Sequence, residues 1–255
     1  MDSSLTRVQP VFNELYDKEK TGETWLARLL QLPQHTRTSI IPENLGYLDQ
    51  PPVFELPADP PRRFLRWLLE HREGLCCPNQ GIQKKWSKRT QQKRQALLRG
   101  DELVCEEAIA ELEGSDRLPG RAWWRLEGVT RVDCAITTPT TAIFVEGKRT
   151  EMGASKAVEW YPCRNQVLRN LDCASVFAEQ TKRQQFFVLL VVEGKIVDQD
   201  PVRQAEIKSI TSPDTIRTSL PHLNDDERRD LLAHYLGVTT WEHIADTFAL
   251  SSLRL

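Results

Sequence analysis

The spacing of apolar and polar residues in the centre of the chain predicts helices alternating with strands. Apolar residues recur at helical spacing from residue 101 to residue 113, and Gly114 ends that helix. A second helix is expected from 157 to 177. Short runs of β-branched and aromatic residues predict strands at 121–126, 131–136, 142–148 and 186–192. The last run is apolar throughout, so we expect that strand to be buried on both faces.

The two ends of the chain predict helices. Residues 21–31 and 61–72 have apolar residues at helical spacing, and prolines between them exclude one long element. Near the C-terminus, Asn224 with Glu227, and Thr239 with Glu242, have the spacing of capping boxes, which predicts a pair of helices.

The element order predicts an α/β fold with a mixed sheet, because a helix separates the last strand from three consecutive ones. We expect a helical N-terminal extension over residues 1–80 and one α/β domain over 81–255 that ends in a C-terminal helical hairpin. That hairpin superficially resembles a helix-turn-helix, as in a transcriptional regulator. Its second helix has no Lys or Arg to read DNA bases, so a packed hairpin is favoured.

Composition narrows the class of protein. The net charge is −2, so attraction to a polyanion requires a local concentration of basic residues. The longest apolar run, 186–192, is too short to span a membrane, and the first residues lack the features of a secretory signal. The six cysteines show no zinc-ligand spacing, which favours reduced, mostly buried thiols. We therefore expect a cytoplasmic protein.

One segment has the local concentration of basic residues that binding to a polyanion requires. Residues 83–100 contain seven Lys and Arg and no acidic residue. Lys85, Lys88, Arg89 and Lys93 would lie near one face of a helix, where they could follow a row of phosphates. An ordinary solvated helix explains the same pattern, so both interpretations stay open.

The most informative segment is the pair of strands around the loop at residues 137–141. In a hairpin here, residues whose numbers add up to 279 face each other, which places Asp133 opposite Glu146 with side chains about 5 Å apart. Lys148 lies two residues after Glu146 and therefore on the same face. The other face would keep the apolar side chains of Val132, Cys134, Ile136, Ile143 and Val145.

Two neighbouring carboxylates repel each other unless a positive charge neutralises them. Mg²⁺ or Mn²⁺ prefers such oxygen ligands, acidifies a bound water and stabilises charge on phosphoryl oxygens. A lysine beside the metal can orient the attacking water or balance negative charge in the transition state. Asp133, Glu146 and Lys148 therefore predict hydrolysis of a phosphodiester, with DNA as the expected substrate.

On these three residues, the sequence resembles the PD-(D/E)xK superfamily of restriction-endonuclease-like nucleases. The resemblance covers about residues 100–192 and implies an αβββαβ core. It further implies that Asp133, Glu146 and the backbone carbonyl of Gly147 hold Mg²⁺, while Lys148 positions the attacking water. Val132 stands where the family name has proline, a departure that many members share.

The resemblance also suggests supporting residues. The helix at 101–113 resembles one that often provides a metal-binding glutamate, which makes Glu106 the candidate, with Glu107 next. The helix after Lys148 often contributes a polar residue, here Gln166, and Arg164 and Arg169 are candidate phosphate contacts. Some exonuclease-type members have Tyr four residues after this Gln, where this chain has Asn170.

The alternative function is a nuclease-like domain that has lost catalysis and binds nucleic acid or protein. The intact acid pair and lysine favour an enzyme over this alternative. DNA versus RNA, endonuclease versus exonuclease action and the oligomeric state, including a dimer, are left open by the sequence.

Overall fold

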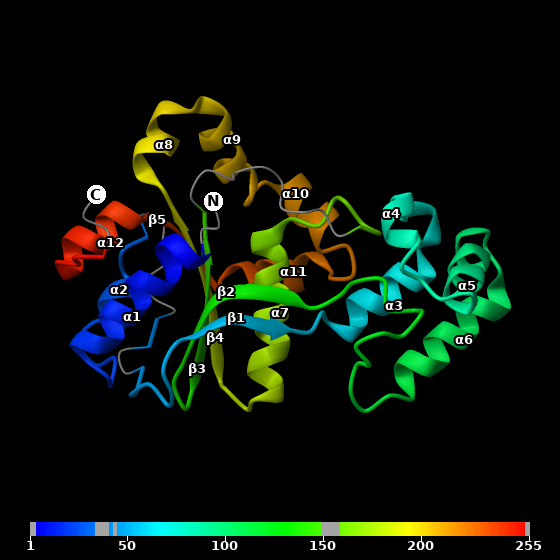
Figure 1. Ribbon diagram of the computed structural model, residues 1–255, viewed down its shortest axis with the longest axis horizontal. Coiled ribbons are helices and arrows are strands. Elements are labelled where there is room, and N and C mark those ends of the chain that lie inside the picture. Colours follow the sequence, from blue (N-terminus) through cyan, green and yellow to red (C-terminus); the bar gives the residue numbers. More distant parts are fainter. Residues whose placement is uncertain (1–3, 34–40, 43–44, 149–158, 253–255) are drawn as a thin grey trace.

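The computed structural model describes residues 4–33, 41–42, 45–148 and 159–252. Figure 1 shows a twisted sheet with helices on both faces and, beside it, a lobe built from α3 to α6. The lobe lies in the chain between the first and second strands. The α/β class predicted from the sequence is therefore confirmed.

The sheet has five strands in the order β1-β2-β3-β4-β5. β1 pairs antiparallel with β2, and β2 with β3, whereas β3 to β4 and β4 to β5 are parallel. The strands are β1 (Val53–Ala58), β2 (Thr130–Thr137), β3 (Thr141–Gly147), β4 (Gln185–Val192) and β5 (Tyr235–Thr240). The continuous run in β4 is buried from Phe187 to Val192, as the apolar sequence predicts.

One face of the sheet is covered by segments from both ends of the chain. They are the π-helical turn η1 (Ser4–Val8) and the helices α1 (Gln9–Lys18), α2 (Leu26–Leu30) and α12 (Trp241–Phe248). Phe12, Leu29 and Trp241 join Ile143 and Val145 of β3 in one buried core. Burial of these side chains fixes both ends of the chain on the central strands.

The opposite face is covered mainly by α7 (Gln166–Gln180), which begins where the side chain of Asn165 accepts hydrogen bonds from the backbone N–H groups of Val167 and Leu168. Leu168 and Leu171 pack here against strand residues. The helices α8 (Gly194–Gln199), α9 (Pro201–Ser209), α10 (Pro213–Ser219) and α11 (Asp225–Leu232) follow β4. The Asn224–Glu227 capping box at the start of α11 is present as predicted.

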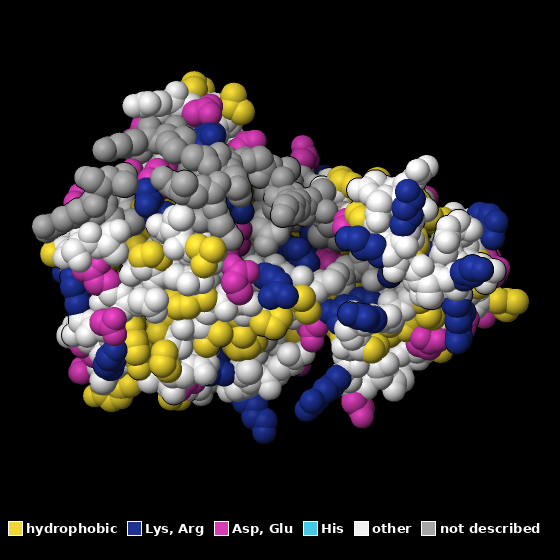
Figure 2. Space-filling model, viewed as in Figure 1, with side chains coloured by type: hydrophobic (Ala, Val, Ile, Leu, Met, Phe, Trp, Pro, Cys, Tyr) yellow, Lys and Arg dark blue, Asp and Glu magenta, His cyan; other side chains and the backbone are white. Residues whose placement is uncertain are grey.

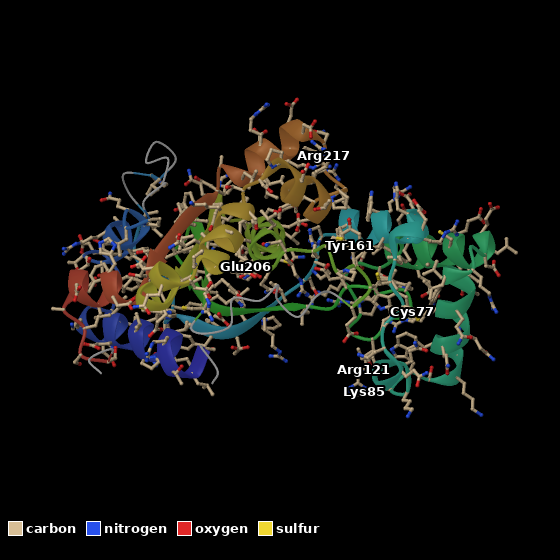
Figure 3. All side chains as sticks on the ribbon, turned by 90° about the horizontal axis from the view of Figure 1, so that it is seen from above. Cys77, Lys85, Arg121, Tyr161, Glu206 and Arg217 are labelled. Carbon is tan, nitrogen blue, oxygen red and sulfur yellow. The ribbon has the colours of Figure 1, made fainter. Side chains whose placement is uncertain are left out.

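The lobe has a separate aromatic core. Its elements are α3 (Arg62–Glu70), the 3₁₀ turn η3 (Arg72–Gly74), α4 (Gln80–Gln83), α5 (Lys88–Leu98) and α6 (Glu102–Glu113). Phe64 and Leu68 of α3 pack with Trp123, Trp124 and Tyr161. Figure 3 shows Tyr161 at the junction of the lobe and the sheet, where its hydroxyl donates to the backbone oxygen of Thr218, at 2.7 Å. In the described part of the chain, no helix is long and apolar enough to cross a membrane.

Several predicted elements are wrong. Residues 121–126 form turns instead of a strand, because both tryptophans are buried in the core of the lobe. The first strand of the sheet is instead β1, within the region expected to be a helical extension. The predicted helix at 157–177 begins only at Gln166, and residues 157–158 lie outside the described residues.

The predicted C-terminal helical hairpin is also wrong. α11 ends at Leu232, and the next residues form β5, which pairs with β4. Helix α12 is capped by Thr240, whose side chain accepts from the backbone N–H of His243, and not by Thr239. Both predicted helices are therefore present, as α11 and α12, but β5 separates them, which removes the resemblance to a helix-turn-helix. Of the six cysteines, three are buried, at positions 105, 134 and 173, and three are exposed.

Candidate functional site

The hairpin of β2 and β3 has the predicted register. Cys134 pairs with Val145 and Ile136 with Ile143, so the facing residue numbers add up to 279. Continued by one residue, this register brings Asp133 opposite Glu146. The prediction that these two carboxylates lie close together is supported by their electrostatic interaction, which raises the pKa of Asp133. We call Asp133 and Glu146 the acid pair.

The expected apolar face of this hairpin is correct except at its start. Cys134, Ile136, Ile143 and Val145 belong to the core beneath α1 and α12. Val132 instead packs into the core beneath α7. Strict alternation therefore breaks at Asp133, which lies between two residues that point to opposite cores.

Lys148 follows β3 directly and forms an ion pair with Glu146 of the acid pair. Its Nζ lies 2.6 Å from Oε1 of Glu146. Its backbone N–H donates to the carbonyl of Val191 at 2.8 Å, and its carbonyl accepts from Nε1 of Trp241 at 3.2 Å. These two hydrogen bonds of its backbone, one to β4 and one from α12, hold Lys148 at the end of β3.

Gly147, between Glu146 and Lys148, is required by packing. A Cβ atom there would lie 2.5 Å from Cγ2 of Val8 and 2.8 Å from Cζ2 of Trp241. The absent side chain lets η1 and α12 approach the strand closely. The backbone N–H of Gly147 donates to Oδ2 of Asp133 at 2.8 Å, which connects the two strands through a side chain.

The first turns of α7 contribute the next layer of contacts. Asn170 is fully buried, and its Nδ2 donates to Oε2 of Glu146 at 2.7 Å. Nε2 of Gln166 donates to Oδ1 of Asn170 and to Oγ1 of Thr130, both at 3.1 Å. Gln166 thus reaches the acid pair through Asn170. The sequence could have indicated Asn170, because it lies four residues after Gln166 on the same helix face.

Burial and charge repulsion shape the electrostatics of the acid pair. Removal from water and the neighbouring carboxylate of Glu146 together raise the pKa of Asp133 from its ordinary value near 3.8 to about 7. The hydrogen bond from Gly147 and the charge of Lys148 oppose this rise without cancelling it. The site therefore has a deficit of positive charge at neutral pH.

A third carboxylate, which sequence reasoning missed, contributes to this deficit. Glu55 of β1 lies opposite Asp133 in register, between the pairs Phe54–Cys134 and Leu56–Val132. Its φ of 53° is in the left-handed region, unusual for a residue other than glycine, and it interrupts the pairing there. Its charge also raises the pKa of Asp133. It was missed because β1 itself was not predicted.

Glu106 and Glu107 are not brought to the acid pair. Both are on α6, which packs against α3 and α5 within the lobe. Glu106 is exposed, and Glu107 forms an ion pair with Lys93. Figure 1 shows α6 at the end of the molecule away from β3. This placement gives no support to a metal-binding role for Glu106 or Glu107. The helix that contacts the acid pair is α7, and not α6.

Arg164 is unavailable for a phosphate. Its side chain is fully buried, pairs with Asp172 at 2.6 Å and lies 3.9 Å from the centre of the Phe64 ring. Arg169 is partly buried and pairs with Glu127 at 2.9 Å. Both guanidinium groups hold α7 against the lobe, and for Arg164 the proposed phosphate contact is contradicted by burial.

The basic segment is divided between the surface and the interior. Lys85, Lys88 and Arg89 are exposed. Figure 2 shows Lys and Arg side chains gathered over α4 and α5, and Figure 3 locates Lys85 on this lobe. Arg94 is buried, and its Nε donates to the carbonyl of Trp123 at 2.7 Å.

The single helical face expected for these cations is wrong. Lys85 lies in the turn between α4 and α5, whereas Lys88 and Arg89 begin α5. The side chain of Lys93 is mostly buried in its ion pair with Glu107. Of the four cations predicted to share a face, three therefore remain exposed, one in the turn before α5 and two at the start of α5.

Two further findings concern groups that could bind a metal ion and the comparison with known proteins. Among the described residues, no three His, Cys, Asp or Glu side chains form a group that could hold a metal ion. A scan against protein-family models matches none, and searches of curated proteins and of solved structures find no match.

Proposed function

We propose that the protein is a metal-dependent nuclease that hydrolyses phosphodiester bonds through the acid pair and Lys148. One observation carries this proposal. Two carboxylates face each other on β2 and β3, one ammonium group follows at the end of β3, and burial leaves the carboxylates with too little positive charge. A bound divalent cation would neutralise the two carboxylates. The same ion could stabilise the negative charge on the phosphoryl oxygens of a phosphodiester during hydrolysis.

The acid pair suits Mg²⁺ or Mn²⁺. Asp133 and Glu146 would hold the ion, and Oδ1 of Asp133 accepts no hydrogen bond from the described residues. Mg²⁺ commonly binds through one or two carboxylates and keeps several waters, so two carboxylates are enough protein ligands for it. When bound, the ion would acidify a water and offset charge on the phosphoryl oxygens. The carbonyl of Gly147 is a further candidate ligand.

The surrounding residues would position the reacting groups. Lys148, held by Glu146 and by its backbone hydrogen bonds, can donate to the phosphate or to the attacking water as negative charge develops. Asn170 fixes one oxygen of Glu146, which leaves the carboxylate a defined orientation. Gln166 in turn holds Asn170 and acts one contact further away.

The strand order supports the finer fold assignment, a restriction-endonuclease-like core. α1, β1, β2, β3, α7 and β4 follow one another in the αβββαβ order of that superfamily, with the short helix α2 between α1 and β1 and with α3 to α6 inserted between β1 and β2. The first helix and strand of this arrangement differ from those expected from the sequence. The acid pair still occupies the second and third strands, with Lys148 directly after the third.

Nucleic acid, with DNA as the expected form, would approach from the side of the lobe. The exposed Lys85, Lys88 and Arg89 can contact phosphates there without reading bases. Such contacts would hold a substrate whatever its sequence.

A cleavage assay with supercoiled, linear and single-stranded DNA, and with RNA, tests the proposal. We expect cleavage of at least one substrate with Mg²⁺ or Mn²⁺ and none with EDTA. Asp133→Asn, Glu146→Gln and Lys148→Met should each reduce the rate at least about a hundredfold. Asp116→Asn, which alters an exposed carboxylate in the lobe, is the matched control and should leave the rate unchanged. Binding without cleavage in the wild type would favour the non-catalytic alternative.

A further inference from the structure

A cavity of about 600 Å³ lies on the α7 side of the sheet, between β5 and the helices α9, α10 and α11. No residue of β2, β3 or α7 lines it, so it is distinct from the acid pair. It is nevertheless close. Val238 in its lining pairs with Leu190, and Leu190 pairs with Glu146, which places the cavity two strands from the acid pair, or about 10 Å.

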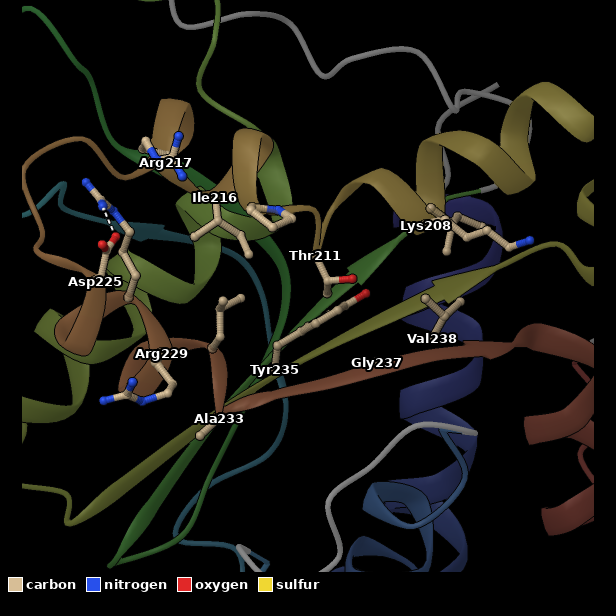
Figure 4. A pocket seen from close by; sticks show the side chains of 14 residues that line it. Lys208, Thr211, Ile216, Arg217, Asp225, Arg229, Ala233, Tyr235, Gly237 and Val238 are labelled. Carbon is tan, nitrogen blue, oxygen red and sulfur yellow. Dashed lines mark hydrogen bonds and ion pairs between the residues drawn. The ribbon is translucent and has the colours of Figure 1, made fainter.

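The interior of the cavity is mainly apolar. Ile216, Leu232 and Val238 contribute aliphatic side chains from three elements. Figure 4 shows Tyr235 extending from β5 into the space between Ile216 and Val238. The Tyr235 hydroxyl is shielded from solvent and has no hydrogen-bond partner among the described residues. A buried hydroxyl in this state gains from an acceptor, because it otherwise loses its hydrogen bonds to water.

Basic side chains lie along the rim of the cavity. Lys208, Arg217, Arg228 and Arg229 line it, against Asp225 as the one acidic side chain of the lining. Arg228 is engaged by Asp225 at 2.8 Å and by the carbonyl of Leu220. Arg229 pairs with Asp226 at 2.6 Å, and Arg217 with Asp214 at 3.8 Å. Lys208 is exposed and has no ion-pair partner among the described residues. The lining therefore combines an apolar interior with one ammonium group at its edge, that of Lys208.

We propose that this cavity binds a small organic anion with an apolar body, such as a medium-chain carboxylate. The apolar body would fill the space beside Ile216 and Val238, and the anionic group would lie near Lys208. An oxygen of the ligand would accept from the Tyr235 hydroxyl. The volume is within the range of small-molecule sites.

Other occupants fit less well. A nucleobase needs several hydrogen-bonding partners, and the lining has no Asn or Gln side chain to offer them. A peptide strand would pair with the backbone at the edge of β5. The cavity instead lies on the face of β5, where Tyr235 and Val238 pack against the core. The proposal does not depend on the hydrolysis proposed above.

Isothermal titration of the full chain with decanoate, and separately with 1-decanol, tests this site. We expect saturable binding of decanoate to one site, at least about fivefold tighter than the binding of 1-decanol. Ile216→Trp, which fills the cavity, should weaken decanoate at least tenfold. Ile216→Phe provides a smaller filling variant if the first fails to fold. Lys208→Ala should weaken decanoate several-fold and leave 1-decanol unchanged, whereas Lys20→Ala, an exposed lysine outside the lining, should change neither.

Four results would overturn the assignment. Decanoate could show no saturable binding, or it could bind the folded filling variant as tightly as the wild type. Adenosine monophosphate could bind more tightly than decanoate in the same cavity, which would make the ligand a nucleotide. A change from dimer to monomer on Ile216→Trp in size-exclusion chromatography would instead assign the cavity to a second copy of this chain.

Discussion

Replacement of Asp133 by Asn should stabilise the metal-free protein at alkaline pH and leave its stability nearly unchanged at acid pH. The variant keeps the shape of the side chain and an oxygen that can accept from Gly147. It removes a carboxyl whose pKa is raised in the folded state from about 3.8 to about 7 by burial and by Glu146. The folded protein therefore holds this proton over a pH range in which the unfolded chain has lost it.

The sign and the size of the effect follow from this difference. Because the folded state binds more protons between the two pKa values, wild-type stability falls as pH rises through that range and then levels off above about 7. Each pH unit costs about 1.4 kcal/mol while the two states differ by one proton. Between pH 5 and pH 8, the wild type should lose about 2–3 kcal/mol relative to Asp133→Asn.

Urea denaturation in EDTA at pH 5, 6, 7 and 8 measures this difference. Glu55→Gln should reduce the loss, because the Glu55 charge helps to raise the pKa of Asp133. The control Asp116→Asn alters an exposed carboxyl and should follow the wild type. If the unfolding free energies of wild type and Asp133→Asn change in parallel with pH, the electrostatic description of the acid pair is refuted.

Three further predictions concern the surroundings of the acid pair and the lobe. Gly147→Ala should lower the unfolding free energy by about 1–3 kcal/mol, since its Cβ would lie 2.5 Å from Val8; an unchanged urea midpoint would contradict this packing. Asn170→Ala should slow single-turnover cleavage about 10- to 100-fold without unfolding the protein, because it frees an oxygen of Glu146. Combined replacement of three exposed cations should reduce the dependence of log K on log salt by about 2–3 in Ca²⁺, and an equal slope would mean that they contact no phosphate. These three changes are Lys85→Ala, Lys88→Ala and Arg89→Ala.

The sequence predicted the hairpin of the acid pair because its information is local. Alternation along β2 and β3 and a short connecting loop determine the register, so Asp133 and Glu146 could be paired without a structure. Lys148 then followed from its spacing. The buried strand β4 was recognised from its composition for the same local reason.

The errors arose where distant contacts decide the structure. Trp123 and Trp124 are residues that favour a strand. Both side chains pack in the core of the lobe, however, and the backbone there forms turns. β1 was missed because it contains Pro57 and pairs with a strand more than seventy residues later. Glu55 was lost with it, and Glu106 was assigned to the site because α6 was the nearest helix in sequence.

Charged residues were the hardest to interpret from sequence. Arg94 and Arg164 were indistinguishable there from surface cations, yet both are buried and held by the interior of the protein. Their role depends on partners such as Asp172 and the carbonyl of Trp123, which only the fold brings near. Residue type alone could not separate them from Lys85.

The central claim is that the acid pair and Lys148 act together with a divalent cation on phosphodiester bonds. The most direct measurement is the single-turnover rate of DNA cleavage by the wild type and by Glu146→Gln, with Mg²⁺ and with EDTA. We predict cleavage by the wild type in Mg²⁺, none in EDTA, and at least a hundredfold slower cleavage by the folded variant. Equal rates for wild type and variant, or cleavage that persists in EDTA, would contradict the proposed function.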